Sequence, residues 1–175
     1  MNTLAWTHAV RDVPAGGLPV ERQATPAELQ ALALALLIPS VEAVAAKYRL
    51  VPATGGRLRL QGTVRAQVTQ ECVVTLEPVP GTVVVDLDVV YCSEAGAATT
   101  GEDGLIGDLD APDEEPIENG TVDIGRVVFE EIASGLDPYP RREGANFDWT
   151  DETAARAATH PFAALARLKK PDATS

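Results

Sequence analysis

Hydrophobic and polar residues alternate with a period of two through much of the region between residues 41 and 91. The clearest example is residues 57–69, in which, apart from Gly62, the even-numbered positions are apolar and the odd-numbered positions are polar or charged. Successive side chains of a strand point to opposite faces of a sheet. The pattern therefore predicts a half-buried antiparallel strand with one face in solvent.

Further apolar segments flank this strand at the spacing of hairpins. Segments rich in proline or glycine, at residues 52–56 and 77–81, are typical of the turns between them. The predicted strands are residues 43–51, 57–69, 72–76 and 82–91, and residues 3–10 could add a short edge strand. The order predicts an antiparallel β-meander, curled into a sheet or a partial barrel.

Two main helices are predicted to flank this sheet. The first begins with Thr25 as N-cap and Glu28 completing a capping box, and runs to Ile38. It is apolar around most of its circumference, so we expect it to be buried or to pack against a partner. The second spans residues 124–134, with Asp123 as cap. The fold class is therefore α+β.

The C-terminal part predicts smaller features. After the second helix, residues 136–140 contain two prolines and are expected to be extended. Asp148 or Thr150 could cap a short alanine-rich helix that reaches about residue 159. Residues 160–175 form a tail in which Phe162, Leu165 and Leu168 have the spacing of a docking helix.

Length and composition set the outer limits. The 175 residues are typical of one domain, so we expect a single domain over residues 1–175. The apolar fraction of 45% is enough for one core, and 14 glycines and 13 prolines argue against a bundle of long helices. Residues 93–119 are rich in glycine and acids, and we expect this acidic linker to be partly mobile.

Charge is distributed unevenly along the chain. The net charge is −12, but residues 92–120 hold nine acids and no base, whereas residues 43–70 hold five bases and no acid. A negative total charge argues against nucleic acid as a partner only when the charges are mixed. Here an acidic belt and a basic stretch are separate, and the total charge does not decide between partners.

The basic stretch predicts a cationic face on the sheet. The candidate contacts, which have matching parity on their strands, are Lys47, Arg49, Arg57, Arg59 and Arg65. One interpretation is contact with RNA phosphates, independent of base identity. In the other interpretation, Asp86 and Asp88 or the acidic belt neutralise these cations within the protein. A combined hypothesis has the belt covering the face until a binding partner displaces it.

A second candidate surface follows the second helix. Tyr139 stands between two prolines, and Arg141 and Arg142 follow. This combination is typical of base stacking with phosphate contact, or of a hot spot for a protein partner. Alternatively, Tyr139 packs back onto the sheet and the segment only ends the helix.

No pattern predicts catalysis, a cofactor, a metal or a small-molecule substrate. Two cysteines and two histidines are scattered without the paired spacing of a zinc site. Phosphate-binding loops, a nucleophile elbow and metalloprotease motifs are not found in the sequence. The longest apolar run, residues 29–38, is about half of the ~20 residues that a membrane span requires. With no signal-peptide pattern visible, we expect a cytoplasmic protein without membrane contact.

Three segments resemble the bacterial YceD family, in the form common to alphaproteobacteria. They are residues 62–78, a strand that runs into a turn led by Cys72; residues 122–142, with the helix and the Leu-Asp-Pro-Tyr-Pro-Arg-Arg segment; and residues 161–169. The resemblance implies a non-enzymatic factor that supports accumulation of large-subunit ribosomal RNA, with that RNA or a basic ribosomal protein as partner. The alternative is an acidic adaptor or chaperone for a basic client protein. The oligomeric state stays open.

The turn led by Cys72 departs from part of this family. Some members carry a Cys-x-x-Cys-like pair there, whereas here Cys72 is followed by Val73, Val74 and Thr75. The resemblance therefore implies no metal or redox role for this turn, and we expect both cysteines to be buried free thiols.

Overall fold

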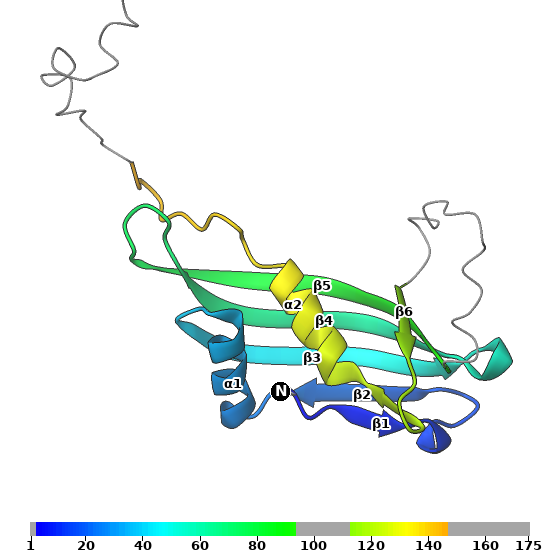
Figure 1. Ribbon diagram of the computed structural model, residues 1–175. Helices are drawn as coiled ribbons and strands as arrows, with labels where there is room; N and C mark the ends of the chain where they lie inside the picture. Colours follow the sequence, from blue (N-terminus) through cyan, green and yellow to red (C-terminus); the bar gives the residue numbers. More distant parts are fainter. Residues whose placement is uncertain (1–2, 94–112, 147–175) are drawn as a thin grey trace, which may run out of the picture. The chain divides into compact units, whose positions relative to one another are not determined.

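The computed structural model describes residues 3–93 and 113–146, and shows an α+β fold (Figure 1). The compact unit considered below ends at Glu143. Its elements are β1 (Thr7–Ala9), a 3-10 turn η1 (Val10–Asp12), β2 (Leu18–Gln23), α1 (Pro26–Leu36), β3 (Ser40–Pro52), a 3-10 turn η2 (Thr54–Gly56), β4 (Leu58–Glu71), β5 (Pro78–Cys92), β6 (Asp113–Pro116), β7 (Thr121–Asp123) and α2 (Ile124–Ser134).

The main sheet has five strands in the order β2-β3-β4-β5-β6 and is not closed into a barrel. Neighbouring strands are antiparallel except β5 and β6, which are parallel. Strands β1 and β7 form a small antiparallel sheet of their own. The predicted meander is confirmed for β3, β4 and β5, which follow one another in the chain and in the sheet.

One face of the sheet carries the core. Helices α1 and α2 lie on this face, together with the small β1–β7 sheet (Figure 1). Even-numbered residues of β3 and β4 point into it, so that Leu50 lies opposite Leu60 and Ala46 opposite Val64, all four buried. Gly62 lies opposite Tyr48, where a Cβ atom would stand 2.3 Å from the Lys47 carbonyl oxygen, so only glycine fits.

Both helices begin as their caps predict. The side-chain oxygen of Thr25 accepts from the Glu28 amide, and the Glu28 carboxylate accepts from the Thr25 amide, which completes the capping box. Asp123 caps α2 in the same way by accepting from the Arg126 amide. Helix α1 is less buried than predicted, since Leu32 is its one fully buried residue and Leu34 is exposed.

Three predictions about strands were wrong. Residues 72–76 form a turn, in which the Leu76 amide donates to the Cys72 carbonyl, because β4 continues to Glu71 and pairs directly with the start of β5 at Pro78. Strand β2 was not predicted, since it is a charged edge strand with a proline. Residues 113–116, which belong to the predicted linker 93–119, form strand β6. This strand is stabilised by ion pairs of its two glutamates, one on each face of the sheet.

The remaining predictions for the linker and the C-terminus lie outside the described residues. These are the mobility of residues 94–112, the short helix to about residue 159 and the docking tail 160–175. The single domain over residues 1–175 also stays a prediction.

Candidate functional site

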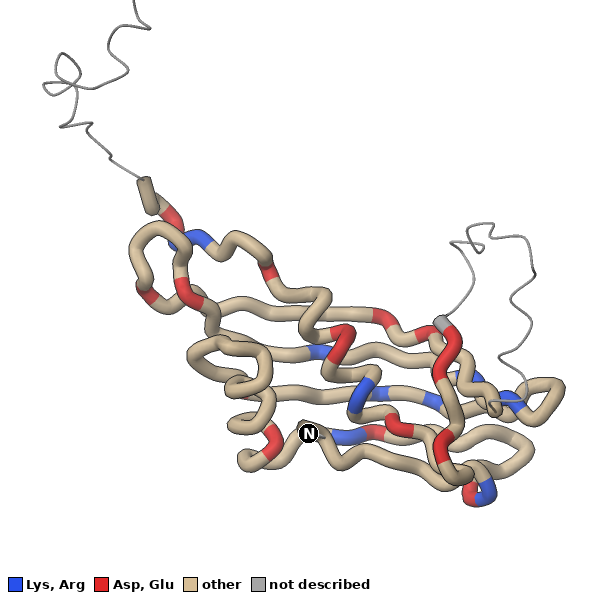
Figure 2. The backbone as a smooth tube through the Cα atoms, in the orientation of Figure 1, with Lys and Arg blue, Asp and Glu red and all other residues tan. Residues whose placement is uncertain are grey.

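The five predicted cations of the basic stretch lie on one face of the sheet. In the β3–β4 register Lys47 lies opposite Thr63 and Arg49 lies opposite Gln61, so odd-numbered residues of the two strands share a face. This is the face opposite to the helices, and no described helix or strand lies over it (Figure 1). We call it the open face, and its cations are Lys47, Arg49, Arg57, Arg59 and Arg65. Arg57 lies directly before β4, and the other four lie on β3 and β4. Figure 2 shows basic positions along these central strands.

Acidic side chains alternate with these cations. The Arg59 guanidinium donates two hydrogen bonds to the Asp88 carboxylate, at 2.7 and 2.6 Å. This pairing raises the pKa of Arg59 and lowers the pKa of Asp88. Lys47 Nζ lies 3.1 Å from Glu21 on the neighbouring strand. The internal neutralisation that the sequence left open is thus observed for Asp88, whereas Asp86 accepts from Thr63.

The other cations differ in their partners. Arg49 donates to the backbone carbonyl of Gly16. Arg57 lies 3.5 Å from Glu114 on β6, so a residue of the acidic segment does reach the open face. Arg65 is exposed between Ala45 and Val84, and it forms no ion pair with another described residue. The open face therefore carries paired and unpaired cations side by side.

The Tyr139 segment lies at the end of the β4–β5 hairpin. The Val73 amide donates to the Pro140 carbonyl, and the Gln70 side chain exchanges two hydrogen bonds with the Asp137 backbone. Arg142 forms an ion pair with Glu77, which raises the pKa of Arg142 and lowers that of Glu77. Tyr139 is 72% exposed, so it does not pack back onto the sheet.

Cys72 links this segment to the hairpin turn. Its buried Sγ accepts hydrogen bonds from the Thr75 side chain and from the Arg142 amide, at 3.4 Å for the latter. These donors, led by the Thr75 side chain, stabilise the thiolate and lower the pKa of Cys72 to about 7. Cys72 and Cys92 are both buried and free, as expected, although Cys72 lies in a turn and not on a strand.

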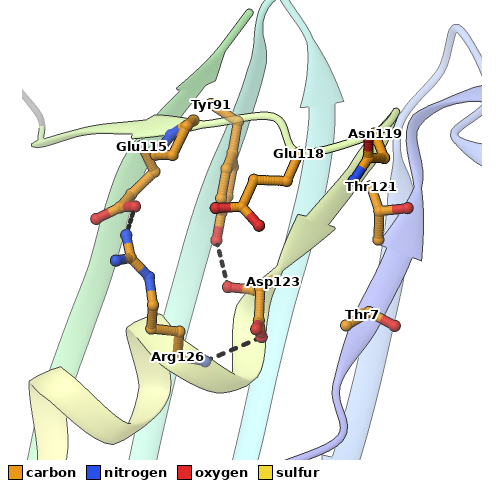
Figure 3. A pocket seen from close by; sticks show the side chains of 9 residues that line it. Thr7, Tyr91, Glu115, Glu118, Asn119, Thr121, Asp123 and Arg126 are labelled. Carbon is orange, nitrogen blue, oxygen red and sulfur yellow. Dashed lines mark hydrogen bonds and ion pairs between the residues drawn. The ribbon is translucent and has the colours of Figure 1, made fainter. Parts of the chain in front are cut away.

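A pocket that sequence reasoning missed lies on the other face, where β6 and β7 meet α2 (Figure 3). Its wall includes the ion pair between Glu115 and Arg126, and the Tyr91 hydroxyl donates to the Asp123 carbonyl at 3.1 Å. The exposed Glu118 also lines it. The pocket was missed because it depends on β6, whose sequence predicts a linker.

The described residues give no indication of a metal centre or a membrane helix. No three His, Cys, Asp or Glu side chains among them are grouped so as to hold a metal ion. Within the same residues, no helix is long and apolar enough to cross a membrane.

The geometry can now be compared with known proteins. The sequence pattern of the family described as "Large ribosomal RNA subunit accumulation protein YceD" matches residues 60–169, more than half of the chain. The chain belongs to the YceD family. No curated protein and no solved structure matches it.

The YceD match does not cover all of the candidate residues. Four candidate residues lie within the matched range of 60–169: Arg65, Tyr139, Arg141 and Arg142. The other four precede this range: Lys47, Arg49, Arg57 and Arg59. The family description names an accumulation protein and not an enzyme. The role of every candidate residue as a partner contact stays a prediction.

Proposed function

We propose that the protein is a non-catalytic ribosome-assembly factor that supports accumulation of large-subunit ribosomal RNA by contacting that RNA through its open face. Membership of the YceD family supports the link to large-subunit RNA. We also propose that the protein acts in the cytoplasm, because bacterial ribosomes assemble there. The site of contact rests on a single observation, the gathering of five cations on an uncovered sheet face.

The ion pairs of the open face are weak enough to be exchanged. Arg59 and Asp88 have 44% and 46% of their side-chain surface exposed, and Lys47 and Glu21 have still more. Exposed ion pairs typically contribute only about 0–1 kcal/mol. An RNA phosphate offers guanidinium the same planar two-point contact as a carboxylate. Phosphates can therefore replace the acids at little cost.

The acids then act as competitors of the RNA. Glu114 from the predicted acidic linker already pairs with Arg57, and Asp88 pairs with Arg59. This is the arrangement expected if carboxylates occupy the phosphate positions before RNA arrives. Arg65 is the residue expected to contact an RNA phosphate first, because among the described residues it has no acidic partner that the phosphate would need to displace.

Replacement of the open-face cations in living cells tests this proposal. In cells whose own copy is replaced by K47Q/R59Q/R65Q, large-subunit RNA should fall relative to small-subunit RNA, because the factor can no longer hold the RNA backbone. The control is R11Q, which removes an exposed arginine that pairs with its neighbour Asp12 and lies in the 3-10 turn η1, off the open face. Normal RNA ratios with the triple variant, at normal protein level, would contradict the proposal.

The pocket where β6 and β7 meet α2 favours a second candidate function, an adaptor for a basic client protein. Glu115, Glu118 and Asp123 line it against the single cation Arg126, which suits a lysine or arginine side chain. Nuclease treatment separates the two functions. A ribosomal complex that survives complete RNA digestion supports the adaptor, and one that falls apart supports RNA contact.

A further inference from the structure

The largest exposed apolar side chains of the described residues gather at one end of the sheet. At this end Ser40, the first residue of β3, lies opposite Thr69 near the end of β4. Helix α1 ends shortly before Ser40, and the β4–β5 turn begins shortly after Thr69. Five of the six exposed large hydrophobic residues among the described ones lie here: Leu34, Leu37, Val73, Leu76 and Tyr139. We call this set the apolar end.

Two of these leucines also have a strained backbone. Leu37, 91% exposed, closes α1 with φ 56°, and Leu76, 69% exposed, closes the hairpin turn with φ 60°. The left-handed region disfavours residues with a Cβ atom, and glycine is the usual residue where a helical turn ends this way. Each leucine thus costs stability twice, through its backbone and through its exposure, without core contacts that would repay it.

A leucine at a position where glycine would close the turn with less strain, and whose side chain is exposed, points to a functional role for that side chain. Apolar patches on a soluble protein typically mark an interaction site. That both leucines lie at the same end makes independent accidents a poor explanation. Tyr139, fixed between two prolines in the adjoining segment, adds an exposed aromatic anchor of the kind found at protein interfaces.

The surrounding charges indicate the chemistry of the partner. The charged residues exposed at this end are Glu42, Glu71, Glu77, Asp137, Arg141, Arg142 and Glu143. Five carboxylates against two guanidinium groups leave a local net charge of −3, and Figure 2 shows more red than blue at this end. An apolar centre with a charged rim is the usual anatomy of a protein interface.

We propose that the apolar end binds an amphipathic protein segment whose apolar side chains are flanked by lysine and arginine. RNA is the poorer fit, because the rim would repel phosphates. This inference goes beyond the proposed function and does not depend on it, since the open face and the apolar end share none of these residues. Either surface could therefore fail its test without the other.

Peptide binding to the full chain tests the proposal. The probe is a synthetic amphipathic helix with a leucine face and a lysine face, and its affinity is measured by fluorescence anisotropy. The comparison peptides have the same composition in scrambled order, or glutamate in place of lysine. Wild-type protein should bind the leucine–lysine helix at least tenfold more tightly than either comparison peptide.

The decisive variant is L37G/L76G. It should bind the leucine–lysine helix at least tenfold more weakly, while its melting temperature is equal to or higher than that of the wild type, because glycine relieves the backbone strain. The matched control is V84T, which alters the sixth exposed hydrophobic residue, on the open face, and should leave peptide affinity unchanged.

Four results would overturn the proposal. The first is failure of the wild type to prefer the patterned peptide, and the second is equal binding by L37G/L76G, which would show unspecific attraction to an acidic chain. The third is a lower melting temperature of that variant, which would make the leucines structural. The fourth is a dimer in sedimentation that L37G/L76G dissociates, because a second copy would then be the occupant.

Discussion

At the scale of single residues, the turn led by Cys72 shows how a few hydrogen bonds set a chemical property. The Cys72 sulfur accepts from Thr75 and from the amide of Arg142, which lies far away in the sequence. The sequence predicted a buried free thiol without a metal or redox role here. The structure gives a buried thiol with a pKa of about 7, because donors that stabilise a thiolate surround it.

Thr75→Val should raise the pKa of Cys72 toward its usual 9.0, since valine keeps the shape of threonine but cannot donate a hydrogen bond. The thiolate absorbance in the ultraviolet, followed against pH in a C92A background, measures this. T82V, which alters an exposed threonine of β5, is the control and should leave the titration unchanged.

The same shift predicts how stability depends on pH. A thiol whose pKa is lower in the folded chain stabilises the fold fully above its unfolded pKa, and this contribution disappears as the pH falls through the folded pKa. The free energy of unfolding of the C92A protein should therefore rise between pH 7 and 9.0, and T75V should flatten the rise. An equal rise in both proteins would show that Thr75 does not tune the thiol.

At the scale of elements, β6 is the strand that the local sequence predicts least well. Its residues, Asp-Glu-Glu-Pro, have neither the alternation nor the β-propensity of a strand. It forms because Glu114 reaches Arg57 on the open face and Glu115 reaches Arg126 of α2 on the core face. Contacts between distant segments thus override the local preference.

Arg126→Ala should loosen β6. Because Arg126 is half exposed, loss of its ion pair with Glu115 is expected to cost about 1 kcal/mol, a roughly fivefold change in an opening equilibrium. Hydrogen exchange of the Ile117 amide, which donates to the Cys92 carbonyl at 2.8 Å, reports this opening. Exchange in R126A should be about fivefold faster than in wild type and in the control R11A; equal rates would mean that the ion pair does not hold β6.

Elements with strong local signals were predicted well. The capping box of Thr25 and Glu28 and the cap Asp123 fixed the starts of both helices, because capping depends on residues only three positions apart. The alternation of residues 57–69 gave β4 and its faces, because one face is buried along its length. Strand β2 has a weaker signal, since as a short edge strand it pairs on one side only.

The candidate site was predictable in part for the same reason. Parity alone places Arg59 and Arg65 on one face, and the structure has them so. Which acid meets which arginine depends on the register of β4 against β5, and this follows from the turn. The predicted turn at 77–81 is instead at 72–77, and it brings Asp88 opposite Gln61, diagonal to Arg59.

At the scale of the whole molecule, its chemistry is divided between surfaces. The open face alternates cations and acids, whereas the apolar end combines exposed apolar residues with an acidic rim. This separation would allow a chain of net charge −12 to present the phosphate site that we propose on the open face. The charge that matters to an approaching RNA is the local one, within about 10 Å at moderate ionic strength.

The most direct test of the RNA contact is the salt dependence of binding between the full chain and a transcript of large-subunit ribosomal RNA. Each phosphate contact contributes about 0.7 to the slope of log affinity against log salt for single strands. K47Q/R59Q/R65Q should therefore bind more weakly with a slope lower by about 2, D88N should bind more tightly because Arg59 is freed, and R11Q should match the wild type. Unchanged affinity and slope in a folded triple variant would contradict the account.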